Sequence, residues 1–321
     1  MKRLLVTVLA GVALAGCTDA ASTPEAEAPA AVPAEAVEAE PVAALAPLPE
    51  IFDCLRQNGG VLVASHRGGP APGYPENALE TLEYGFGKGI RVFEIDVAES
   101  RDGVLFLHHD DRFGRTLAAD GYVSDSDWAV IAKMRLKDTE GDVTAFHAPK
   151  LTDVLLWAKQ KGAIVELDRK GTTGFRNIIE AVKAAGAEGN TVMISYSDEE
   201  AGAIAKLDPT LMMTASARGD RDLGRLEALG VDRTRVIGWT GTREPDPPAF
   251  ERLLAEGVEP AFGTLGRKGE RLDDQYWEDG DGSEYQRLVD DGVVLIATDE
   301  PYRVAEWLDA DDAGWETCAA R

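Results

Sequence analysis

Short apolar runs of strand type alternate with helical segments along most of this chain, and this alternation leaves few folds open. The strand candidates are 61–65, 91–97, 104–109, 163–168, 191–196, 210–215, 235–240, 260–265 and 292–298. Several of the intervening helical patterns end in Gly, which is common at helix C-termini. Repeated βα units predict a parallel sheet, and most simply a (β/α)8 barrel, with an open doubly wound sheet as the alternative.

Nine strand candidates are one more than a (β/α)8 barrel needs. We interpret 235–240 as a short extra strand or a segment at the rim. Residues 111–150 are too long for a simple connection and contain turn-rich polar sequence. We therefore expect a small insertion after the third strand, lying over one mouth of the barrel.

The N-terminal segment has the pattern of an export signal. Lys2 and Arg3 precede an apolar stretch that is too short to span a membrane as a helix. The stretch closes with LAGC at residues 14–17, which resembles the lipobox of bacterial lipoproteins. That resemblance implies a signal peptide over 1–16 and acylation of Cys17, and it places the protein in the bacterial cell envelope, lipid-anchored and facing the periplasm. An ordinary secretory signal is the alternative.

The segment that follows the signal has a different composition. Residues 17–50 are mostly Ala, Pro and Glu and contain no Lys or Arg, so they predict a disordered tether that cannot offset its chain entropy by burial. Residues 51–321 are long enough for one α/β domain with a sizeable core. The net charge of −24 argues against nucleic acid or an anionic membrane surface as a partner. Membrane contact is therefore expected through the lipid anchor only, and no protein partner is indicated.

Two further cysteines lie near the two ends of the predicted domain. In an oxidising periplasm, a disulfide between Cys54 and Cys318 would join these ends. Two buried free thiols are the alternative.

Many polar residues lie at the C-terminal ends of the predicted strands, which is the end that holds the active site in barrel enzymes. They are His66, Arg67, Glu94, Asp96, His109, Asp168, Lys170, Thr298 and Asp299. Because strand side chains alternate, Glu94 and Asp96 share one face, as do Glu166, Asp168 and Lys170. Such carboxylates without a thiolate suit one hard divalent cation, Ca²⁺ or Mg²⁺. Surface carboxylates paired with Arg or Lys are the alternative.

The chain has four histidines, so each can be weighed separately. His147 lies in the polar insertion and is expected at the surface. His108 and His109 are adjacent, so on a strand only one of them can reach the barrel mouth. His66 and one member of that pair could serve as general acid and general base, because imidazole titrates near neutral pH.

Taken together, these motifs resemble the glycerophosphodiester phosphodiesterase family of the PLC-like phosphodiesterase superfamily. The resemblance rests on "HRG", "PEN", "FEIDV", "DGVLFLHHDDRFGRT", "APKLTDVL", "LDRK" and "IATDEP", which occur in the family's order from residue 61 to residue 301. It implies a (β/α)8 TIM barrel with a small insertion after the third strand.

The resemblance also implies a role for each matching position. His66 and His109 would be the acid and base, with His109 preferred to His108 because it directly precedes Asp110. The remaining roles are phosphate binding by Arg67 and Lys170, metal binding by Glu94, Asp96 and Asp168, and support of the site by Glu76. Glu166, on the same strand face as Asp168, is also expected to support the site.

The implied activity is metal-dependent hydrolysis of a glycerophosphodiester to glycerol 3-phosphate and an alcohol. A phospholipase-type phosphodiesterase, acting on lysophospholipid or phosphoinositide head groups, is the alternative. A non-catalytic lipoprotein that binds a phosphorylated solute is a lower alternative, because none of the expected histidines or carboxylates is missing.

Overall fold

The computed structural model describes residues 45–308 and 310–319. The predicted signal peptide, Cys17 and most of the predicted tether lie outside these residues. The described fold begins before the expected boundary at residue 51, because Ala46 and Leu48 are already buried. Within the described residues, no helix has the length and apolar character needed to cross a membrane.

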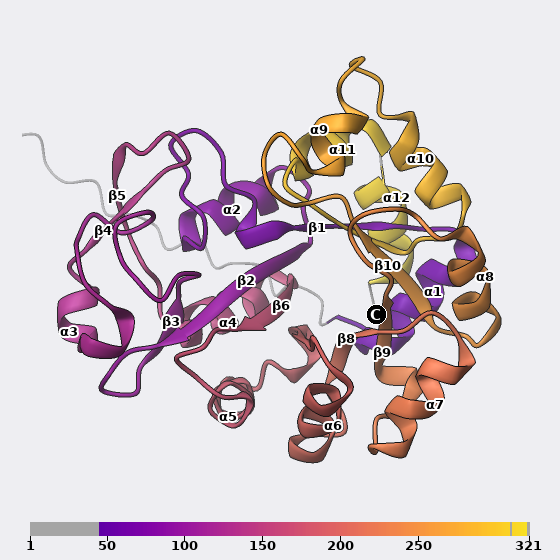
Figure 1. Ribbon diagram of the computed structural model, residues 1–321, viewed down its shortest axis with the longest axis horizontal. Helices are drawn as coiled ribbons and strands as arrows, with labels where there is room; N and C mark the ends of the chain where they lie inside the picture. The colour runs from indigo at the N-terminus through magenta and orange to yellow at the C-terminus, as the bar shows by residue number, and fades with distance from the viewer. Residues whose placement is uncertain (1–44, 309, 320–321) are drawn as a thin grey trace, which may run out of the picture. The chain divides into compact units, whose positions relative to one another are not determined.

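Eight parallel strands close into a barrel, which Figure 1 shows with the helices around it. In order around the barrel they are β1 (Leu62–Ser65), β2 (Val92–Glu99), β6 (Ile164–Arg169), β7 (Thr191–Ile194), β8 (Met212–Ser216), β9 (Val236–Trp239), β10 (Glu259–Gly263) and β11 (Leu295–Thr298). Closure comes from β1, which pairs in parallel with β11 on one side and with β2 on the other. The prediction of a (β/α)8 barrel is confirmed.

Helices surround the barrel, and most of them follow a strand (Figure 1). They are α1 (Leu48–Asn58), α2 (Leu79–Gly87), α4 (Leu151–Lys161), α5 (Phe175–Ala185), α6 (Asp198–Leu207), α7 (Asp220–Ala228), α8 (Pro247–Ala255), α9 (Leu272–Tyr276), α10 (Ser283–Asp290), α11 (Pro301–Leu308) and α12 (Ala310–Cys318). Short 3-10 turns are η1 (His66–Gly68), η2 (Val123–Asp125), η3 (Glu188–Asn190) and η4 (Arg233–Arg235). Gly162 and Gly186 end α4 and α5 with φ of 69° and 59°, a left-handed conformation that glycine adopts without strain.

Successive side chains of each strand point to opposite faces, so the barrel has one apolar core outside its strands and another inside. Outward-facing residues such as Phe93 and Val165 pack against the helices. Inward-facing residues such as Val92 and Ile164 fill the barrel with an apolar layer. Further along the same inward-facing rows the side chains are acidic, so the barrel changes from an apolar floor to a charged mouth.

Two strand predictions were wrong. The segment 235–240, interpreted as an extra strand or rim segment, contains β9, which pairs in parallel with β8 and β10 as a full barrel member. The segment 104–109, taken as the third barrel strand, contains only β3 (Leu105–Leu107), which pairs antiparallel with the end of β2. Strand composition predicts extended backbone but does not determine which partner a strand pairs with, or in which direction.

The predicted insertion at 111–150 forms a small unit beside the barrel, at the left of Figure 1. It contains α3 (Trp128–Ile131), β4 (Arg135–Lys137) and β5 (Val143–His147), and β4 pairs antiparallel with β5. A separate apolar cluster holds it together, with Phe113, Leu117 and other buried residues. His147 is exposed, as expected.

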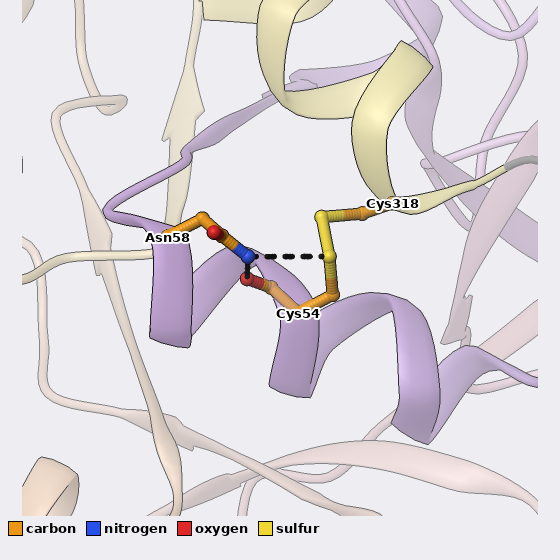
Figure 2. Close-up of a disulfide and its surroundings, with 3 residues drawn as sticks. All are labelled: Cys54, Asn58 and Cys318. Carbon is orange, nitrogen blue, oxygen red and sulfur yellow. Dashed lines mark hydrogen bonds between the residues drawn. A yellow bond between two sulfur atoms is a disulfide. The ribbon is translucent and has the colours of Figure 1, made fainter.

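The two ends of the described fold lie against each other. The buried residues of α1, including Phe52 and Leu55, pack into the inner core together with Cys318 of α12. Cys54 and Cys318 form a disulfide with their Cα atoms 5.6 Å apart, and Asn58 donates a hydrogen bond to the carbonyl oxygen of Cys54 (Figure 2). The bridge therefore ties the C-terminal helix to the helix that precedes the first strand.

Candidate active site

His66 is the first polar residue after β1, and an aspartate from the last strand determines its orientation. Its Nδ1 lies 2.6 Å from Oδ1 of Asp299, which directly follows β11. Its Nε2 lies 4.0 Å from Oε2 of Glu94. Burial alone would lower the pKa of His66, but the hydrogen bond to Asp299 and the charge of Glu94 outweigh burial and raise it. Barrel closure therefore brings this dyad together from residues 233 positions apart.

Asp299 is itself held by several donors. Arg271 pairs with its Oδ2 at 3.0 Å, and the backbone N–H of Gly266 donates to the same oxygen at 3.0 Å. Its own backbone N–H donates to the fully buried Asp273. Asp299 thus has little freedom to turn away from His66.

Arg67 has a backbone conformation that non-glycine residues rarely adopt, with φ of 53° and ψ of 33°. Its N–H donates to Oε2 of Glu94 at 2.7 Å, and its Nη1 donates to both carboxylate oxygens of Glu76 at 3.2 and 3.3 Å. Its Nε is buried and has no hydrogen-bond partner. The buried Nε–H of the Arg67 guanidinium is therefore an unused hydrogen-bond donor, and an anionic ligand could accept from it.

The three predicted metal ligands come together at the barrel mouth. Oxygen atoms of Glu94, Asp96 and Asp168 all lie within 4.8 Å of one another. Asp96 and Asp168 are register partners on the neighbouring strands β2 and β6. Lys170 Nζ lies 2.5 Å from Asp96 Oδ1 and 2.7 Å from Asp168 Oδ2, so an ammonium group currently neutralises part of this charge.

This carboxylate cluster fits a hard divalent cation. Asp168 Oδ1 is buried without a hydrogen-bond partner, which leaves a strong acceptor unused. Burial and repulsion from Asp96 raise the pKa of Glu94 to about 8, as expected where carboxylates are buried close together. For Asp96, burial raises the pKa, but Lys170 and then His109 lower it further than burial raises it.

Asn77, the last residue of the "PEN" motif, holds one of these carboxylates, a role that the sequence did not predict. It is buried and, like Arg67, has positive φ, at 59°. Its Nδ2 donates to Asp96 Oδ2 at 2.6 Å, and its Oδ1 accepts from the Asp96 backbone N–H at 2.9 Å. Asn77 thus orients Asp96 through its Oδ2, while Asp96 Oδ1 faces the ammonium group of Lys170.

The second histidine of the predicted pair also carries an aspartate. Nδ1 of His109 lies 2.7 Å from Oδ1 of Asp110, and the ring is partly exposed. His108 faces the other way, where it is buried between Phe106 and Phe113 and contacts Thr116 Oγ1 through Nδ1. The alternation of side chains along this segment thus separates the two neighbouring rings.

A cavity of about 270 Å³ extends from the carboxylates across the mouth toward β7 to β10. Its lining includes His66, Glu94, Glu166, Asp168, Ser195, Tyr196, Thr214, Ser216, Trp239 and Thr242. Glu166 lies here as the sequence predicted, and burial raises its pKa to about 7. Tyr196, which sequence reasoning missed, donates its hydroxyl to Asp168 Oδ2 at 2.8 Å. The cavity is lined by three carboxyl groups, several hydroxyl groups, an indole ring and the apolar side chains of Ile194, Leu265 and Ala297.

This chain is similar in sequence to known phosphodiesterases. The sequence model of the glycerophosphoryl diester phosphodiesterase family matches residues 66–204. A glycerophosphodiester phosphodiesterase of Caldanaerobacter subterraneus subsp. tengcongensis is 26% identical over 246 residues, which cover 75% of this chain and 94% of that protein.

Solved structures share the architecture. A glycerophosphoryl diester phosphodiesterase from Parabacteroides distasonis superposes with a TM-score of 0.71 at 25% identity, covering 83% of this chain and 93% of that one. A phosphodiesterase from Oleispira antarctica, solved with the product sn-glycerol-3-phosphate, has a TM-score of 0.61 at 20% identity and covers 79% of this chain and 99% of that one. It shares the fold.

Proposed function

Because this chain belongs to the glycerophosphoryl diester phosphodiesterase family and is a phosphoric diester hydrolase, we propose that it cleaves glycerophosphodiesters to glycerol 3-phosphate and an alcohol with the help of one divalent cation. The observation that carries the proposal is the meeting of two Asp-oriented histidines, a three-carboxylate cluster and a buried unpaired arginine nitrogen at one barrel mouth. The Oleispira antarctica structure with bound sn-glycerol-3-phosphate supports the same product.

The histidines supply the proton transfers. In the overall reaction an oxygen nucleophile forms a bond to phosphorus, and the bond from phosphorus to the alcohol oxygen breaks. One imidazole takes the proton of the nucleophile, and the other gives a proton to the departing alcohol oxygen. Nδ1 of His66 contacts Asp299, and Nδ1 of His109 contacts Asp110. In each ring the other nitrogen, Nε2, is therefore the one that can take or give the proton.

The cationic groups bind the phosphodiester. Arg67 presents its unpaired Nε beside Asp96, with 3.9 Å between Nε and Asp96 Oδ2. Lys170 supplies a second cation at the same carboxylate. These groups neutralise the charge of the phosphoryl oxygens and favour the more highly charged transition state.

The cation would be held by Glu94, Asp96 and Asp168, and their oxygen donors suit Ca²⁺ or Mg²⁺. When bound, it would supply Lewis-acid stabilisation of negative charge on the phosphoryl oxygens.

A panel of phosphodiesters tests the proposed function and its nearest alternative. Glycerophosphodiesters with different alcohols are compared with lysophospholipids and phosphoinositides, each with Ca²⁺, Mg²⁺, Mn²⁺ or Zn²⁺ added after chelation. Release of glycerol 3-phosphate from the glycerophosphodiesters is expected. Turnover confined to lysophospholipids or phosphoinositides would instead favour the phospholipase-type activity.

The N-terminal LAGC pattern supports a further part of the proposal, an anchor formed by acylation at Cys17 and a location at the periplasmic side of the cell envelope. In a bacterial host, the protein is expected in the membrane fraction, and Cys17→Ser is expected to release it. Recovery of both forms in the soluble periplasmic fraction would contradict the anchor.

A further inference from the structure

Arg115 lies in the insertion and makes four hydrogen bonds to two carboxylates. Its Nε and Nη2 donate to Asp110 at 2.7 and 3.0 Å. Its Nη1 and Nη2 donate to Glu76 at 2.6 and 2.8 Å. One guanidinium therefore joins the residue that follows His109 to the glutamate of the "PEN" motif.

Both carboxylates also contact residues of the candidate active site. Asp110 Oδ1 contacts Nδ1 of His109 at 2.7 Å. Glu76 accepts from Nη1 of Arg67 at 3.2 Å on one oxygen and 3.3 Å on the other. The contacts form an unbroken series from the imidazole of His109 through Arg115 to the guanidinium of Arg67.

The geometry of this series requires an arginine. Two carboxylates, each accepting a pair of bonds, match the planar five-donor fork of a guanidinium, whereas an ammonium group has only three donors. Burial alone would raise the pKa of Asp110, but hydrogen bonds from Arg115 and then His109 hold it well below its ordinary range. Asp110 therefore stays ionised while it accepts the Nδ1 proton of His109.

The fold of the insertion places Arg115 between Asp110 and Glu76. Thr116 and Leu117, which follow it, are buried. Leu117 forms a bridge with Leu136, and Lys137 donates its N–H to the carbonyl of Thr116 at 2.8 Å. The Arg115 side chain itself keeps 46% of its surface exposed, so its four hydrogen bonds, rather than tight packing, determine where it lies.

We propose that Arg115 is a positioning residue for the phosphodiesterase reaction and that the insertion thereby takes part in catalysis. It holds Asp110 so that His109 presents Nε2 to the substrate, and it holds Glu76 so that Arg67 faces the phosphodiester. This inference rests on the proposed function, because it assigns His109 to proton transfer.

Kinetics in two backgrounds test the inference. We expect Arg115→Gln to lower kcat on the order of 10- to 100-fold, the usual effect of losing a residue that orients a functional group. Arg115→Lys should recover only part of this loss. In a His109→Ala background, Arg115→Gln should lower kcat by a smaller factor than in the wild type, because one of the two groups it orients is gone and only its hold on Glu76 and Arg67 remains.

A matched control separates this effect from general damage. Arg101, just after β2, makes a similarly bidentate, exposed pair with Asp127 of the insertion at 2.9 and 2.7 Å, and Arg101→Gln should leave kcat unchanged. An equal loss in the wild-type and His109→Ala backgrounds, or the same loss for Arg101→Gln, would overturn the inference.

A spectroscopic readout works even if glycerophosphodiesters are not the substrate. Long-range ¹H–¹⁵N spectra, assigned with His109→Ala, should show His109 with its proton on Nδ1 in the wild type. Arg115→Gln should shift it toward a mixture of tautomers, and Arg101→Gln should not. An unchanged His109 signal in Arg115→Gln would refute the positioning role, whereas absent turnover with the expected shift would refute only the proposed substrate.

Discussion

Each of the two candidate catalytic histidines carries an aspartate on its Nδ1, but the two aspartates come from different parts of the chain. Asp110 is the immediate neighbour of His109, whereas Asp299 reaches His66 from the last strand. The sequence pattern could place both histidines at the barrel mouth because both follow strand-like runs. It could not pair His66 with Asp299, because that contact exists only after the barrel closes.

The histidines give the sharpest test at this scale. His66→Ala and His109→Ala should each lower kcat by about two to four orders of magnitude, the usual contribution of a positioned acid or base. Steady-state turnover of a glycerophosphodiester measures the effect. His108→Ala is the matched control, since that ring is buried in the insertion core and should affect stability more than turnover. Equal losses in turnover for all three variants would show that the pair was wrongly assigned.

At the scale of elements, the predictable features are those set by local pattern. The period of two placed Glu94 and Asp96 on one strand face, and the structure has both at the barrel mouth. The same pattern could not show that β3 runs antiparallel to β2, because composition does not encode the direction of pairing. Asn77 and Arg115 were missed for a related reason, since each acts through a loop whose partner lies elsewhere in the chain.

The turn after α6 offers a pH-dependent test away from the active site. Burial alone would raise the pKa of Asp208, but hydrogen bonds from Thr210 and then Lys183 outweigh burial and lower it. A carboxyl whose pKa is lower in the folded state than in the unfolded chain stabilises the fold. This stabilisation is fully present when the pH is above the unfolded-state pKa of about 3.9, and it is lost as the pH falls through the folded-state pKa.

We therefore expect Asp208→Asn to lower the free energy of unfolding at pH 7 by up to about 1 kcal/mol, given that Lys183 is partly exposed. The difference from wild type should shrink steadily below pH 4 in urea unfolding experiments. Asp120→Asn removes the same charge from an exposed site of the insertion and serves as control. A difference that grows as the pH falls would reverse the predicted sign.

For the domain as a whole, barrel closure brings the two ends of the described chain together. Ala46 donates its backbone N–H to the carbonyl of Ala319 at 3.1 Å, and the Cys54–Cys318 disulfide joins residues 264 positions apart. Near the same end of the barrel, Arg56 of α1 pairs with the buried Glu259 at 2.8 Å. The helix before the first strand and the last helix are thus fastened to each other.

Removing the bridge should destabilise the domain without changing its active site. Chain-entropy arguments put the stabilisation from so long a loop at no more than about 4–5 kcal/mol. The Cys54→Ser/Cys318→Ser double variant should therefore unfold at lower urea concentration, while its kcat stays close to that of the wild type. Wild-type protein treated with reductant is the matched control. An unchanged unfolding midpoint in both samples would contradict a stabilising role.

Restoring a cation to metal-free enzyme tests the proposed metal dependence of glycerophosphodiester cleavage and its assignment to Glu94, Asp96 and Asp168. Release of glycerol 3-phosphate is measured as Ca²⁺ or Mg²⁺ is added back to chelated wild type and to Asp96→Asn. We expect negligible release without metal, recovery that saturates near one ion per chain, and a large shift to higher metal concentration in Asp96→Asn. Full release by verified metal-free enzyme, or identical metal curves for the two proteins, would contradict the proposal.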